Sequence, residues 1–111
     1  MFKVDKNKIS LTRGDTAYLD LDIADANGIP YVSHAGDQVI LSVKRNITDE
    51  NYAFQKSVNP GEAITIKPED TQTLDCGRYV YDIQLTTSLG EVFTIIEKNV
   101  FCIGEEVTNG K

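Results

Sequence analysis

The residues of this sequence that could perform chemistry are few and widely spaced. The sole histidine, His34, has no serine or cysteine nucleophile placed in a pattern that predicts a triad. Asp20, Asp22, Asp25 and Asn27 could gather oxygen ligands for calcium, but their spacing lacks the ligand loop and the late glutamate of an EF-hand. A solvated acidic face is the favoured interpretation. The sequence therefore predicts no metal, no cofactor and no enzymatic activity.

The two cysteines, Cys76 and Cys102, are far apart in the sequence. If a hairpin turn at residues 88–91 sets the register of the strands on either side, Cys76 falls close to Cys102, and a disulfide between them is geometrically feasible. Two reduced thiols are favoured, because disulfides belong to exported proteins and the sequence shows no export signal.

Two short motifs have plainer structural explanations than functional ones. Arg13-Gly14-Asp15 is an integrin-ligand tripeptide, but it precedes a predicted strand, where the glycine supplies a turn and the aspartate can cap backbone amides. Asn46-Ile47-Thr48 is a glycosylation sequon, which we expect to be idle without a signal peptide.

Length and charge limit the classes of protein and partner. A chain of 111 residues is long enough for one domain with its own core. The net charge of -6 disfavours nucleic acid as a partner, and no apolar run is long enough for a membrane helix or a signal peptide. We expect a flexible arm over residues 1–7, a single domain over 8–104 and a tail over 105–111.

Alternating apolar and polar residues predict short strands separated by turn signals. The strands are expected at residues 9–13, 16–24, 38–45, 52–58, 62–67, 79–87, 92–97 and 100–103, with a bulge at 98–99. Pro68, Glu69 and Asp70 favour one short helical turn near residues 68–74. The pattern indicates an all-β fold, an immunoglobulin-like antiparallel β-sandwich of about seven to eight strands.

One stretch carries a more specific fold signal. Asp75, Gly77, Tyr79 and Tyr81 have the spacing of the tyrosine corner of immunoglobulin-like domains, in which the hydroxyl of Tyr79 would bond to backbone upstream. Tyr81 would then take the place of the second disulfide cysteine, with an apolar contact replacing the bridge. Two core tyrosines on an ordinary strand are the plainer alternative.

Several segments, in this order and spacing, resemble the amino-terminal domain family of phage and prophage upper baseplate proteins. The matching pieces are LTRGDTA (11–17), NGIPY (27–31), GD (36–37), VILSV (39–43), PEDT (68–71), Leu74, GRYVYDI (77–83), GEVFT (90–94) and EVT (106–108). The resemblance implies an immunoglobulin-like domain that serves as an attachment or connector module and has no enzymatic activity. Longer members continue into a coiled coil and receptor-binding parts, whereas this sequence stops at Lys111.

The resemblance predicts a non-enzymatic virion protein, assembled in the bacterial cytoplasm, that contacts other tail or baseplate proteins or further copies of itself. Tyr18, Ile40 and Val80 are predicted to face outward on polar strand faces, and we expect them to contribute to such contacts. The alternative is a carbohydrate-binding or cell-surface adhesion module. In that case Tyr18, Tyr31 or Tyr52 would stack on sugars, although the sequence contains no tryptophan.

Overall fold

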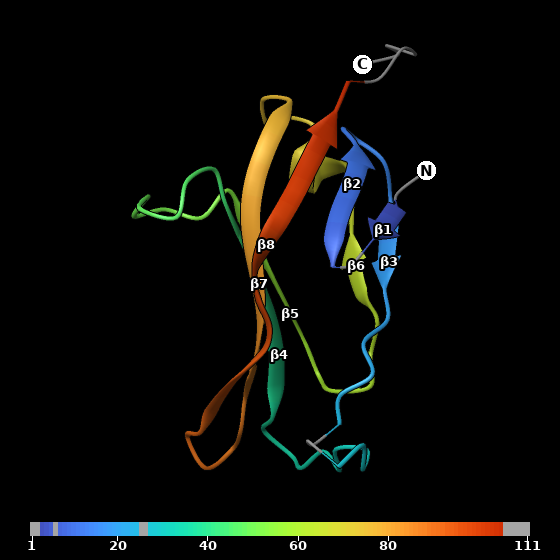
Figure 1. Ribbon diagram of the computed structural model, residues 1–111, viewed down its shortest axis with the longest axis vertical. Helices are drawn as coiled ribbons and strands as arrows, with labels where there is room; N and C mark the ends of the chain where they lie inside the picture. Colours follow the sequence, from blue (N-terminus) through green and yellow to red (C-terminus); the bar gives the residue numbers. More distant parts are fainter. Residues whose placement is uncertain (1–2, 6, 25–26, 106–111) are drawn as a thin grey trace.

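The structure, a computed structural model, describes residues 3–5, 7–24 and 27–105. Eight strands and one helical turn make up the fold (Figure 1). The strands are β1 (Lys3–Asp5), β2 (Lys8–Thr12), β3 (Ala17–Leu19), β4 (Gln38–Lys44), β5 (Phe54–Val58), β6 (Ile64–Ile66), β7 (Gly77–Thr86) and β8 (Val92–Gly104). The helical turn is α1 (Pro68–Thr71). The all-β fold predicted from the sequence is confirmed.

The strands form two sheets of unequal size. The larger has the order β1-β2-β8-β7-β4-β5, and the smaller consists of β3 and β6 alone. Buried residues of both sheets belong to one hydrophobic cluster, so the smaller sheet covers part of one face of the larger. In Figure 1 the small sheet lies beside the upper half of the long β7–β8 pair.

The core follows from the period of two in β4 and β7. From Val39 in β4 and from Tyr79 in β7 onward, every second residue is buried and the residues between are partly buried. The ring of Phe101 packs edge-on against Phe54 and Tyr81, with centroids 5.8 Å and 6.1 Å apart. The buried apolar residues are Ile9, Leu11, Ala17, Leu19, Val39, Leu41, Val43, Ile64, Ile66, Tyr79, Tyr81, Ile83, Leu85, Phe101 and Ile103.

Three sequence predictions about the strands need correction. Lys3–Asp5 is a strand paired with β2, where a flexible arm was expected. The large sheet is mixed and not purely antiparallel, because β2 runs parallel to β8. The strand expected over residues 16–24 ends at Leu19, after which only Ala24 forms an isolated bridge, with Pro30. The alternation of apolar and polar residues predicted too long a strand here, because it shows which residues share a face but not whether a neighbouring strand is present.

The helical turn begins at Pro68 as predicted and holds three segments together. Its first turn is closed by the Lys67 N–H, which donates to Asp70 Oδ2 at 2.8 Å, and the same oxygen lies 2.9 Å from Lys56 Nζ on β5. The buried hydroxyl of Thr71 accepts a 2.8 Å hydrogen bond from the Gly14 N–H in the turn before β3. No helix in the described ranges has the length and apolarity needed to cross a membrane.

The long β7–β8 pair is interrupted twice. Tyr81 pairs with Asn99 and Ile83 with Ile96, so two residues of β8 oppose the single residue Asp82. A second shift follows before Gln84. The bulge predicted at residues 98–99 is therefore confirmed but lies at 97–98. The second bulge was not predicted. Such bulges increase local twist and bend β8 along its length.

The stretch that includes both core tyrosines is fixed by hydrogen bonds to backbone. The Tyr79 hydroxyl donates to the Asp75 carbonyl at 2.7 Å, and the Arg45 guanidinium lies 4.7 Å from the centre of the Tyr79 ring. The Tyr81 hydroxyl donates to the Asn7 carbonyl, and burial raises the pKa of Tyr81 to about 12, so this donor stays protonated. Tyr81 therefore makes a hydrogen bond to the backbone in addition to the apolar contact expected from the sequence.

The Tyr79 bond predicts a measurable contribution to stability. Tyr79→Phe keeps the ring and removes the donor to the Asp75 carbonyl. We expect the free energy of unfolding in urea to fall by about 1 kcal/mol, the usual net value of such a bond. Tyr52→Phe, at an exposed ring, is the matched control and should leave it unchanged. Equal midpoints for the wild type and Tyr79→Phe would show that the bond does not stabilise the fold.

Candidate functional site

The structure does not bring the three predicted contact residues together. Tyr18 is 60% exposed on β3 in the small sheet. Ile40 and Val80 are only partly buried, on β4 and β7 of the large sheet, where they alternate with core residues. They therefore lie on the face of the large sheet that points away from the core, and no single surface includes all three.

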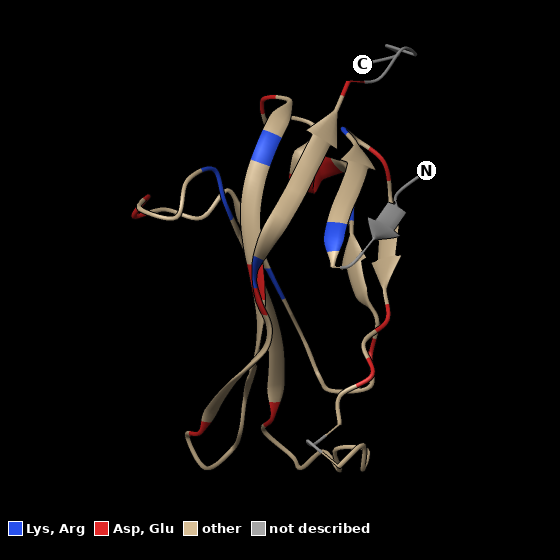
Figure 2. Cartoon of the chain, in the orientation of Figure 1, with Lys and Arg blue, Asp and Glu red and all other residues tan. Residues whose placement is uncertain are grey.

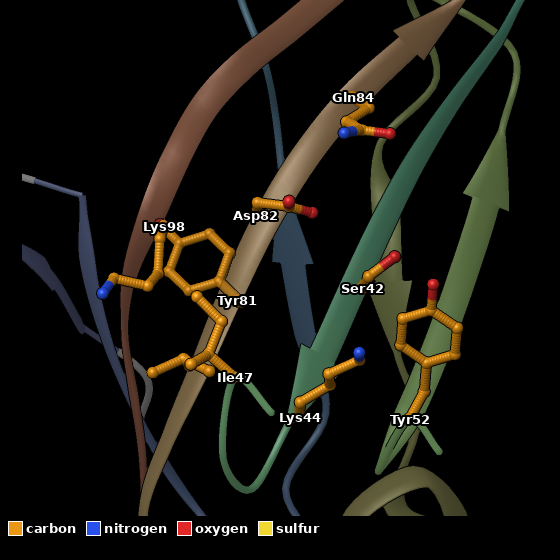
Figure 3. Close-up of a pocket in the computed structure, with 9 residues that line it drawn as sticks. Ser42, Lys44, Ile47, Tyr52, Tyr81, Asp82, Gln84 and Lys98 are labelled. Carbon is orange, nitrogen blue, oxygen red and sulfur yellow. The ribbon is translucent and has the colours of Figure 1, made fainter. Parts of the chain in front are cut away.

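The outer face of the large sheet has a shallow polar hollow of about 180 Å³. Figure 3 shows Ser42 and Lys44 on β4, and Asp82 and Gln84 on β7, with Tyr52 beside Lys44. The Lys44 ammonium lies 5.0 Å from the centre of the Tyr52 ring and donates to a backbone carbonyl at 2.7 Å. One face of the ring is thus covered by a cation of the protein itself.

Asp82 is the one acidic group in this hollow with a perturbed pKa. Burial against the sheet raises the pKa of the Asp82 carboxyl, and the positive charge of Lys44 opposes that shift. Ser42 is opposite Asp82 across β4 and β7, and its hydroxyl accepts a 2.9 Å hydrogen bond from Gln55 Nε2, so the arrangement suits hydrogen bonding more than proton transfer.

A larger and more apolar groove lies on the opposite face of the large sheet. It has a volume of about 500 Å³ and is formed between the start of β8 and the irregular segment that follows β3. Leu85 of β7 also lines it. The residues that line it are Ile23, Ala24, Ile29, Pro30, Tyr31, Val32, Leu85, Phe93, Thr94 and Ile95.

Several large apolar side chains around this groove face solvent. Ile29 is 60%, Val32 is 73% and Phe93 is 48% exposed. Such residues are unremarkable when scattered, but a gathered set marks a surface that binds something. Sequence reasoning missed these residues, since Ile29 and Val32 follow a turn signal and Phe93 alternates like a core residue. Only the exposure in the folded chain distinguishes them.

The loop that carries the groove is anchored by a buried carboxylate. Asp37 Oδ2 accepts hydrogen bonds from the Tyr31 hydroxyl at 2.6 Å and the His34 N–H at 2.8 Å, and Oδ1 accepts one from the Ser88 N–H at 2.9 Å. These bonds, led by that from Tyr31, hold the pKa of Asp37 below its usual range. Asp37 thereby joins the loop after β3 to the β7–β8 hairpin.

The other chemically capable residues do not form a site. The His34 ring is exposed, with Nδ1 3.9 Å from the Asp37 carboxylate. Asp20 and Asp22 are exposed, and Asp25 lies outside the described residues. Within residues 3–5, 7–24 and 27–105, no three His, Cys, Asp or Glu side chains are close enough to share a metal ion.

The Asp37 contacts predict a specific pH dependence. The pKa is lowered in the folded protein, so the stabilisation is present above the unfolded value of about 3.9 and is lost as the pH falls through the folded value. Asp37→Asn should therefore be less stable than the wild type at pH 7, with the gap narrowing below about pH 4. Thermal melts from pH 7 to pH 2 measure this gap.

The control for that experiment is Glu105→Gln, at an exposed carboxylate just after β8. We expect this variant to follow the wild type throughout the acid range. A gap between the wild type and Asp37→Asn that does not change with pH would show that Asp37 acts by packing and not through its charge.

Both cysteines are free thiols in the structure. Cys102 is opposite Arg78 in the β7–β8 ladder, whereas Cys76 precedes β7 and packs at the margin of the core. Thiol titration of the denatured, unreduced protein should therefore find two reactive groups per chain. Fewer than two would indicate the disulfide that the hairpin register made feasible.

The chain matches no protein-family model, and comparison with curated proteins and with solved structures finds no significant match. The function of the chain therefore has to be proposed from its own residues and geometry.

Proposed function

We propose that this protein is a non-enzymatic structural protein of a phage or prophage. In this proposal it is an immunoglobulin-like baseplate or tail module that attaches or connects other virion proteins through protein–protein contacts. The observation that carries the proposal is the exposed apolar groove between β8 and the loop after β3. Apolar surface of this kind is covered in the working state of most proteins.

The order of the strands supports the immunoglobulin-like part of the proposal. In the large sheet β8, β7, β4 and β5 are neighbours in the order of strands G, F, C and C′ of a variable-type domain, and β3 pairs with β6 as strand B pairs with E. The Tyr79 hydroxyl bonds to the carbonyl four residues upstream, as a tyrosine corner requires. Tyr81 stands two residues later, at the position of the disulfide cysteine.

The distribution of polar groups supports binding over catalysis. The groove is lined mainly by aliphatic and aromatic side chains, and the Tyr31 hydroxyl at its wall is already bonded to Asp37. The outer hollow holds Lys44 and Asp82, but Lys44 is engaged by Tyr52 and a backbone carbonyl. Ser42 is opposite Asp82 in the β4–β7 ladder, but its hydroxyl accepts a 2.9 Å hydrogen bond from Gln55 Nε2, which disfavours its use as a nucleophile.

A carbohydrate-binding module is the second candidate. One observation favours it: Tyr52 is half exposed beside the polar side chains of Ser42, Asp82 and Gln84. Lys44 covers one face of the ring, so a sugar would have to stack on the other. Binding to a glycan array that is lost in Tyr52→Ala would favour this candidate over the first.

Association with virus particles tests the first candidate. An affinity-tagged copy is expressed in the strain whose genome encodes the chain, and tailed particles are purified by density gradient. We expect the protein to co-purify with the tail at a fixed ratio to the tail proteins, measured by mass spectrometry. Tyr52→Ala is the control and should be incorporated equally. Particles that lack the wild-type protein would refute the virion role.

A further inference from the structure

The two halves of β8 have different neighbours. Over Phe101 to Ile103 the strand pairs with β7 on one side and with β2 on the other. Over Val92 to Lys98 its only strand partner in the described part of the chain is β7. Figure 1 shows β2 beside the upper half of β8 only. The backbone groups on the outer edge of the lower half are therefore open to a further strand.

This open edge has a bulge at Ile95, between the pairs Gln84–Thr94 and Ile83–Ile96, but it lacks the other features that usually protect the edges of sheets. Residues 92–96 read Val-Phe-Thr-Ile-Ile and contain no charge, proline or glycine. Charged residues, Glu97 and Lys98, come only at the bulge that ends this half. An apolar edge of this kind promotes aggregation unless something covers it.

The open edge also runs beside the apolar groove. The hollow of about 500 Å³ lies along Phe93 to Ile95, and a second hollow of about 300 Å³ lies next to Ile96. The same irregular segment forms the opposite wall of both, since it contributes Ile23 to the first and Leu21 to the second. A strand added to β8 would thus direct every second side chain into these hollows.

The charges around the groove restrict what can occupy it. Positions 14–43 and 79–97, which supply both walls of the larger hollow, contain no lysine or arginine. The smaller hollow is also lined by Asn7 and Ile9, on either side of the exposed Lys8. Asp20, Asp22 and Glu91 are exposed on these segments. Figure 2 shows acidic residues and no basic ones on the lowest part of the molecule. The rim therefore attracts a basic segment and repels an acidic one.

We propose that an extended segment of another protein adds as a strand to the edge of β8 between Val92 and Ile96. Its alternate side chains are apolar and enter the groove, and Lys or Arg residues at its ends face the acidic rim. The inference rests on the proposed function, because the segment belongs to another virion protein. A second copy of this chain is disfavoured, since each copy has a net charge of -6 and would bring a like-charged rim.

A synthetic peptide in which Val and Thr alternate, with Lys at each end, serves as the probe. Amide hydrogen exchange of the full chain is measured by NMR with and without the peptide. We expect exchange at the amides between residues 92 and 96 that point to the outer edge to slow by about tenfold or more, because the added strand would bond these groups. The same peptide with Glu at its ends should bind more weakly.

Ile29→Lys and Ile47→Lys form a matched pair of variants. The two isoleucines are 60% and 59% exposed, and Ile29 lines the groove whereas Ile47 lines the hollow on the opposite face. Both variants should fold, which circular dichroism checks. Ile29→Lys should weaken peptide binding by about tenfold, because it removes an apolar contact and repels the Lys ends. Ile47→Lys should bind like the wild type.

The inference would be overturned by the absence of protection at residues 92–96, by equal weakening in both variants, or by equal binding of the Glu-ended peptide. Protection that appears without peptide as a dimer forms would also overturn it, because a second copy would then be the occupant. Particle incorporation separates the two proposals. If the wild type and Ile29→Lys enter particles equally, strand addition is rejected but the virion role is kept. If the wild type is absent from particles, the virion role is rejected.

Discussion

The six-stranded sheet has a longer apolar face than the two-stranded sheet can cover. Strands β3 and β6 are three residues each, whereas β7 has ten and β8 thirteen. The upper half of the large sheet is closed by β3, β6 and α1 into a core around Phe101. In the lower half Val39 and Leu85 are also buried, and there the irregular segment after β3 takes the place of the small sheet as the covering layer. Most features of the molecule follow from this mismatch.

Irregular backbone can cover a sheet only if its polar groups find partners. Here Asp37 provides them, because one carboxylate accepts hydrogen bonds from a phenol in the loop, an amide in the same loop and an amide in the β7–β8 hairpin. The carboxylate is buried, which would be unfavourable without these donors. The part of the loop from Tyr31 to Asp37 is therefore anchored without belonging to either sheet, while the apolar side chains of Ile29 and Val32 are exposed.

The sequence predicts well what depends on local period and backbone restriction. The structure confirms three such predictions: the alternation of β7, the start of α1 at Pro68 and the hydrogen bond from Tyr79 to upstream backbone. What it could not show depends on contacts between distant segments: the parallel pairing of β2 with β8, the burial of Asp37 and the exposure of Phe93. Alternation says which residues share a face, but only the area of the opposing layer decides how much of that face is covered.

The uncovered groove also limits how strongly one copy can hold a partner. Burial of apolar surface contributes about 25 cal/mol per Å², but association and the ordering of an extended segment oppose much of that gain. A single added strand is therefore a weak contact. In the proposed virion role, several linked copies would multiply such weak contacts into firm attachment without any new contact. An edge that binds modestly would suit that role, because a misplaced partner could still dissociate before the remaining contacts form.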